Sequence, residues 1–176
     1  MHSSFHQLLY AQSSMHSEHT DNNTISQYIG QENRIIKSLS SEDIKSLETG
    51  TGDAFGGMAK LAELNGYPGP RHVLDLGKEL GLTTAQKENI TMIYNYMKRE
   101  ALKLGQEILQ IEKTANELFD NKSISDSELQ RLIIKSAENY GKLRYIHLTT
   151  HLKMMDILSQ EQIILYNTLR GYNTTM

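Results

Sequence analysis

The sequence contains neither cysteine nor tryptophan, and only two of its 176 residues are proline. Without cysteine there can be no disulfide, no thiolate metal site and no thiol catalysis. No stretch comes near the roughly 20 consecutive apolar residues that a membrane-spanning helix requires, so we expect no membrane insertion. The net charge of -3 comes from 18 basic and 21 acidic residues that are interspersed along the chain. This balance predicts no basic face for nucleic acid or anionic lipid.

The sequence also lacks the motifs of common enzyme classes. It has no nucleophile elbow, no phosphate-binding glycine loop and no His-Glu-x-x-His pattern. The glycines at positions 50, 52, 56 and 57 are not followed by the Lys-Ser or Lys-Thr pair of a phosphate-binding loop, so we interpret them as a flexible link between two helices. We therefore expect no enzymatic activity and no catalytic residues.

Residues 1–34 are rich in Ser, His, Asn, Gln and Thr, and their apolar residues follow no helical or strand period. This composition predicts a flexible N-terminal tail. Residues 1–4 lack the charged and apolar regions of an intact export signal, although residues 8–11 resemble the remnant of one. The tail histidines are either incidental to a solvated segment or loose metal ligands: His2, His6, His16 and His19. Residues 35–176 are predicted to form one helical domain.

Both prolines, Pro68 and Pro70, lie in the turn-rich segment 65–70, which should separate two short helices. Gly66 suits the position just after the first of them. Pro70 suits the first turn of the second, which we expect to run to about residue 80 and to end at Gly81.

An apolar stripe with a heptad-like period predicts one long helix from residue 84 to about residue 119, roughly 54 Å long at 1.5 Å per residue. Its residues recur at spacings of three and four: Ile90, Ile93, Met97, Ala101, Leu104, Ile108, Ile111, Ala115 and Leu118. After a turn at 120–123, a second long helix is expected from about 126 to 157. Its stripe is Leu129, Ile133, Tyr140, Leu143, His147, His151, Met154 and Leu158.

The matching lengths predict an all-α fold, in which a long antiparallel helical hairpin is flanked by short helices. Apolar residues outside the two stripes need cover from the short helices, from a client protein or from a second copy of the chain. They include Met92, Tyr96, Leu102, Ile134, Ile146 and Leu148. A homodimer is the simplest arrangement that covers them.

Two segments 76 residues apart share a motif, an apolar residue followed by Thr or Ser and, three residues after the hydroxyl, Gln. The motif residues are Leu82, Thr83 and Gln86 in the first copy, and Leu158, Ser159 and Gln162 in the second. Each copy is a capping box, in which the hydroxyl and the glutamine amide satisfy free N–H groups of the first helical turn. Ser40 and Ser125 begin looser versions of the pattern, so four helix starts are marked.

The paired Leu-Thr-x-x-Gln and Leu-Ser-x-x-Gln motifs resemble the two signatures of the LTxxQ family, which includes the Spy- and CpxP-type stress proteins. The similarity extends over about residues 39–172, and segment 62–72 is typical of one uncharacterised branch. The resemblance implies a helical, often dimeric, non-enzymatic protein of the periplasm. Members of the family include ATP-independent chaperones, modulators of envelope sensor kinases, and metal sensors.

His147 and His151 lie four residues apart on the second long helix, so they project from one face, and Met154 follows within a turn. A set of His and Met ligands suits Zn, Cu, Ni or Co. The metal-sensing relatives imply further ligands, for which His72 and Glu63 are approximate counterparts here. Of the relatives' His and Met pair before the second motif, only Met154 matches by position.

Two other interpretations of these histidines remain open. Both can be neutral and packed in the apolar seam, each hydrogen-bonded to a neighbour such as Tyr94 or Glu100. Alternatively, they can form a pH switch, since protonation near pH 6 would charge a buried seam and loosen the hairpin.

These features predict an envelope-stress accessory protein that binds unfolded proteins or an envelope sensor protein through an apolar helical surface. The slightly acidic charge departs from the basic cradle of the best-known chaperone of the family. The alternative is a metal-binding sensor or sequestering protein that uses His147, His151 and Met154. A purely structural interaction protein is a third interpretation.

Overall fold

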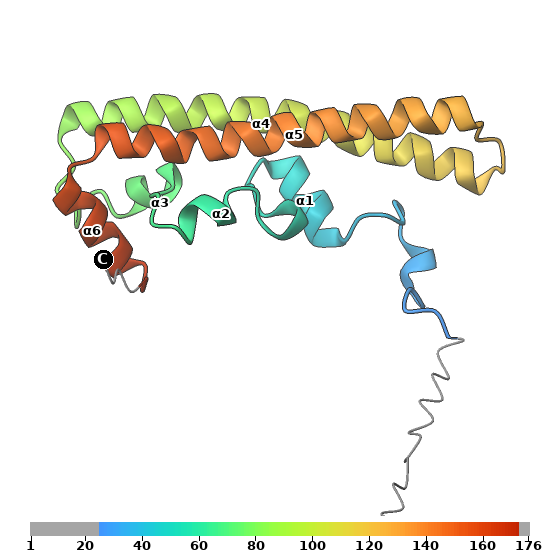
Figure 1. Cartoon of the computed structure of the whole chain (residues 1–176), viewed down its shortest axis with the longest axis horizontal. Coiled ribbons are helices and arrows are strands. Elements are labelled where there is room, and N and C mark those ends of the chain that lie inside the picture. Colours follow the sequence, from blue (N-terminus) through green and yellow to red (C-terminus); the bar gives the residue numbers. More distant parts are fainter. Residues whose placement is uncertain (1–24, 173–176) are drawn as a thin grey trace, which may run out of the picture. The chain divides into compact units, whose positions relative to one another are not determined.

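The computed structural model describes residues 25–172 (Figure 1). The chain divides into two compact units, Met1–Glu32 and Asn33–Met176. In the first unit, the described residues form turns that lead into the short 3-10 helix η1, Gln31–Asn33. The tail histidines expected as loose metal ligands lie outside the described residues.

The second unit is helical, and the described residues include no strand, which confirms the predicted all-helical class. Its helices are α1 (Ser41–Thr49), η2 (Ala54–Gly56), α2 (Lys60–Glu63), α3 (Pro70–Asp75), α4 (Thr84–Asp120), α5 (Asp126–Ile157) and α6 (Gln160–Leu169). Within the described part of the chain, none of them is both long and apolar enough to cross a membrane.

One helix boundary was predicted wrongly. The helix that begins at Pro70 ends at Asp75, and residues 76–81 form successive turns in place of the helix expected up to about residue 80. In these turns the backbone N–H groups of Leu76 and Leu80 donate to carbonyls four residues earlier. Those of Gly77 and Gly81 donate to carbonyls only three residues earlier. The glycine at position 77 lowers the helix propensity at this point, so the regular ladder stops early.

The long helices α4 and α5 lie side by side and run in opposite directions (Figure 1). Ser136 of α5 donates to Glu112 of α4 at 2.9 Å, and Asn139 donates to Glu107 at 3.0 Å. Further along, Thr150 lies 3.5 Å from the sulfur of Met97. Residues later in α5 therefore contact residues earlier in α4, as they must when the two helices run in opposite directions. Helices α1, α2 and α3 lie along one side of this pair.

The stripe of α4 is placed as predicted, and in the first half of α5 Leu129 and Tyr140 are partly buried, but Ile133 was assigned to the buried side wrongly. Ile133 is 55% exposed, whereas Leu132 and Asn139 are buried against α4. The side chain at position 139 is polar and interrupts the apolar pattern. The neighbouring positions therefore fitted a continuous apolar stripe better in the sequence. The amide nitrogen of Asn139 donates to Glu107, whereas its amide oxygen is buried without a partner among the described residues.

The core of the second unit consists of two apolar clusters. The first gathers around α1 and the middle of α4: Ile36, Leu39, Leu47, Ala54, Met58, Ala101, Ile108 and Leu143. The second gathers around α3, α6 and the adjoining ends of the long helices: Val73, Leu80, Ile90, Met154, Leu158, Ile163 and Tyr166. Along α5, the segment between Leu143 and Met154 separates the two clusters, and it carries His147 and His151.

The two motifs interlock. Thr83 and Ser159 cap α4 and α6 in complete capping boxes. In addition, the amide of Gln86 donates to Gln162 at 2.9 Å, and that of Gln162 donates to Gln86 at 3.2 Å. The amide of Gln86 also donates to the backbone carbonyl of Ile157, next to the second motif. The amide of Gln162 donates to the backbone carbonyl of Leu80, close to the first motif. The two motifs thus tie together segments far apart in the chain, beyond starting their own helices.

Replacing Gln86 with alanine is expected to lower the free energy of unfolding by about 2 kcal/mol, because a cap acceptor and three tertiary hydrogen bonds are lost. In a double-mutant cycle with Gln162→Ala, we expect a coupling of about 1 kcal/mol. Urea unfolding measures both quantities. Gln106→Ala, on an exposed position of α4, is the control and should change little. Strictly additive single effects would contradict the amide pair.

Candidate functional site

The two histidines of α5 are buried, with His147 5% and His151 7% exposed. Each imidazole packs against a glycine of the segments that cross α5. A methyl group added at Gly52 would lie 2.8 Å from Cε1 of His147, and one added at Gly69 would lie 3.0 Å from Cε1 of His151. Only residues without a side chain can therefore occupy these two positions without displacing the rings.

His151 is held by the segment that contains the prolines. Its Nδ1 lies 2.8 Å from the carbonyl oxygen of Tyr67, and because a carbonyl only accepts, Nδ1 carries the proton. The same nitrogen is 3.9 Å from Oε2 of Glu63. The expected hydrogen-bond partners, Tyr94 and Glu100, are wrong for this histidine.

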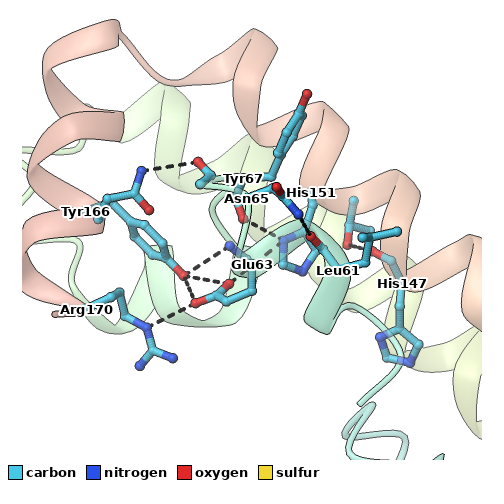
Figure 2. Close-up of polar contacts among 12 residues, drawn as sticks. Leu61, Glu63, Asn65, Tyr67, His147, His151, Tyr166 and Arg170 are labelled. Carbon is cyan, nitrogen blue, oxygen red and sulfur yellow. Dashed lines mark hydrogen bonds and ion pairs between the residues drawn. The ribbon is translucent and has the colours of Figure 1, made fainter. Parts of the chain in front are cut away.

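Glu63 is the centre of a polar cluster that joins α2 to α6 (Figure 2). Its carboxylate accepts hydrogen bonds from the hydroxyl of Tyr166 at 2.9 Å, from Nε of Arg170 at 3.1 Å and from the hydroxyl of Tyr172 at 3.3 Å. The hydroxyl of Tyr166 in turn accepts from the backbone N–H of Gly69 at 3.2 Å. Burial and the negative charge of Glu63 raise the pKa of Tyr166, so this hydroxyl remains protonated and donates.

His147 differs from His151 in having no such partner. Among the residues that the structure describes, none hydrogen-bonds to its ring nitrogens, and the ring is free of dashed lines in Figure 2. Burial, together with a smaller effect of His151, lowers the pKa of His147 from 6.5 to about 4, and Asp53 acts in the opposite direction. The imidazole is therefore neutral at pH 7 and offers one donor and one acceptor nitrogen.

Both histidines line one cavity of about 410 Å³, together with Glu63 and His72. Three of the other four tentative metal ligands differ from His147, because they are already hydrogen-bonded or lie at the rim of the cavity. His151 and Glu63 are already hydrogen-bonded, and the half-exposed His72 lies at the rim, 3.7 Å from Asp75. Burial and the nearby Arg170 lower the pKa of His72.

Met154 does not line this cavity. It is fully buried in the second apolar cluster. The predicted set of His147, His151 and Met154 is thus divided between a cavity wall and the core. Within residues 25–172, no group of three or more His, Asp or Glu side chains is arranged to hold a metal ion.

Comparison with known proteins decides nothing about this site. No family model, no curated protein and no solved structure matches the chain. The resemblance to the LTxxQ family therefore rests on the motif residues themselves, and function has to be argued from the geometry.

Sequence reasoning missed Tyr67, Tyr166 and Arg170. Tyr166 and Arg170 lie four residues apart, which places them on one face of α6 and at its end, and this spacing is the only local signal. Their partner Glu63 is more than 100 positions away in the chain. Only the packing of α6 beside α2 brings the three side chains together.

Proposed function

We propose that this chain is an envelope-stress accessory protein of the LTxxQ type, located in the periplasm, which binds unfolded proteins or an envelope sensor protein on an apolar helical surface. The observation that carries this proposal is a set of large apolar side chains on α4 and α5 that are between 48% and 71% exposed. We call them the outer apolar face: Met92, Tyr96, Ile134, Tyr145 and Leu152.

The position of this face supports a binding role. The short helices α1, α2 and α3 occupy one side of the pair formed by α4 and α5 (Figure 1), and these residues remain uncovered. Met92 and Leu152 lie at similar heights along the pair, because both lie on the same side of the contact between Met97 and Thr150. Met, Tyr and Leu side chains adapt to differently shaped partners, which suits promiscuous binding.

In this proposal α4 and α5 act as an antiparallel hairpin, and two copies associate into a homodimer that leaves part of the outer apolar face accessible. The long hairpin supplies a rigid surface without ATP or a cofactor. The acidic net charge makes apolar contact, and not attraction to acidic clients, the main source of affinity.

The test is suppression of aggregation of a reduced model substrate without ATP. The wild-type chain should suppress aggregation at a few-fold molar excess, and the triple variant Met92→Gln, Tyr145→Gln, Leu152→Gln should lose most of this effect. A matched variant, Glu138→Gln, Lys142→Gln and Thr149→Gln, changes three polar positions of α5 and should keep it. No suppression by the wild type, or equal loss in both variants, would contradict the proposal. Sedimentation of the same proteins reports whether this face also holds a dimer.

A metal-binding sensor or sequestering protein is the second candidate, because His147 and His151 line the same cavity. Its ligands would be the free ring nitrogens of these histidines, for which Zn, Cu, Ni and Co are the suitable ions. Calorimetric titration of each ion into wild-type protein and a His147→Gln, His151→Gln variant tests it. Metal binding in the micromolar range that the variant loses supports the candidate, whereas equal titration curves exclude these histidines.

A further inference from the structure

The cavity that contains His147 has an unusual wall. The imidazole is about nineteen-twentieths buried, yet no described residue hydrogen-bonds to its ring nitrogens. In the described residues, the fully buried side-chain oxygen or nitrogen atoms without a partner are Oδ1 of Asn139 and Oδ1 of Asn167, so the ring nitrogens of His147, which lines the cavity, stay accessible from it. The ring packs on the backbone of Gly52, where an added Cβ would lie 2.8 Å from Cε1 and 2.9 Å from Nδ1.

The same cavity is lined by three cationic side chains, Lys60, Arg71 and Arg170. Arg170 donates its Nε to Glu63 at 3.1 Å, and the side chain of Tyr172 also lies within hydrogen-bonding reach of this guanidinium. Arg71 makes a long, exposed contact of 3.9 Å with Asp75, which is weak at a surface. The ammonium of Lys60 and the guanidinium of Arg71 are therefore the donors most available to a further acceptor.

The carboxylates of the cavity do not balance these cations. They are Asp53 and Glu63, and Glu63 is already occupied by Arg170 and by the hydroxyls of Tyr166 and Tyr172. The remaining lining is neutral and includes the ring of Tyr94 and the side chain of Met97. Such a cavity favours an anion with a less polar body over a bare cation.

The cationic side chains and the imidazole of His147 line the same cavity. Figure 2 shows the guanidinium of Arg170 and the ring of His147 pointing to one side of the Glu63–His151 contact. We propose that this cavity binds a small organic anion, whose carboxylate or phosphate group is held by Lys60, Arg71 and Arg170 while one of its hydroxyls hydrogen-bonds to His147. The volume of about 410 Å³ lies within the range usual for small-molecule sites.

Nuclear magnetic resonance of the isotope-labelled full chain tests this inference with two probes. Citrate carries three carboxylates and a hydroxyl, whereas inorganic phosphate carries only the oxyanion. Citrate should bind with a dissociation constant below about 1 mM at low salt and should shift the ring nitrogen signals of His147. Phosphate should bind more weakly and should leave the ring signals nearly unchanged, because it reaches the cations alone.

Rim variants show where the anion binds. Lys60→Gln and Arg71→Gln change exposed side chains outside the core, so they should fold normally and weaken citrate binding about tenfold each. Lys142→Gln removes a cation from an exposed position of α5 that does not line the cavity and should have no effect. The proposal would be overturned if citrate did not bind at about 10 mM, ten times the expected dissociation constant. It would also be overturned if all three variants weakened citrate binding equally, or if citrate bound without changing the ring signals of His147.

Discussion

Replacing Gly105 with alanine is expected to destabilise the protein by about 3 kcal/mol, although alanine normally stabilises a helix interior by about 1 kcal/mol relative to glycine. Gly105 lies in the middle of α4, where the backbone of α1 crosses it at Leu47. A β-carbon there would overlap the carbonyl oxygen of Leu47 and approach its carbonyl carbon and Cα. Backbone atoms of a helix cannot turn aside as a side chain can, so α1 must move away and open the first apolar cluster.

Gly141 provides the matched control for this substitution. It also lies inside a long helix, α5, but a β-carbon there would meet nothing within 4 Å. Gly141→Ala should therefore stabilise the protein by about 0.5–1 kcal/mol through helix propensity alone. Urea unfolding of the two variants, followed by circular dichroism, measures both changes. Shifts of the same sign would show that α1 does not pack on Gly105 as described.

Acidification from pH 6.5 to pH 4 should remove up to about 3 kcal/mol of stability through His147. Burial, with a smaller effect of His151, lowers the pKa of His147 from 6.5 to about 4. Above pH 6.5 the imidazole is neutral in both the folded and the unfolded chain. Below that pH the unfolded chain takes up the proton first, so the unfolding equilibrium shifts towards the unfolded state until the folded form is protonated too.

Two other groups with shifted pKa values also contribute to the pH dependence. The lowered pKa of His72 acts in the same direction and adds to the effect. Hydrogen bonds lower the pKa of Asp43 against the opposing effect of burial, so this carboxyl group destabilises the fold only in more acidic solution. Urea unfolding at several pH values between 7.5 and 4, with a His147→Gln variant beside the wild type, measures the contribution. A wild-type stability that does not change between pH 7 and pH 5 would contradict the burial of this ring.

Much of the helical layout could be predicted, because its signals are local. The hydroxyls of Thr83 and Ser159 satisfy N–H groups only three residues away, so the sequence shows where their helices begin. The α4 stripe repeats over many turns, and a few misleading positions cannot change its phase. In α5 the polar Asn139 lies on the buried side, and Ile133 was therefore assigned to that side wrongly. The early end of α3 after Asp75 likewise depends on weak local preferences.

The candidate site was predictable only in part. The spacing of His147 and His151 placed both on one face of a helix, and both do line one cavity. Nothing in that spacing indicates that one ring is bonded to the carbonyl of Tyr67 while the other is left without a protein partner. Met154 has a spacing that suits a shared ligand site, but its side chain is fully buried in the second apolar cluster, away from the cavity lining.

The sequence by itself determined the helical class, the extents of the two long helices and their capped starts, since each depends on interactions within a few residues. The tertiary structure alone decided that Gln86 pairs with Gln162, that Glu63 receives Tyr166 and Arg170, and that a cationic cavity forms around His147. These contacts join residues about 70 to 110 positions apart. Their geometry depends on how the packed helices cross, and no local pattern of residues specifies that crossing.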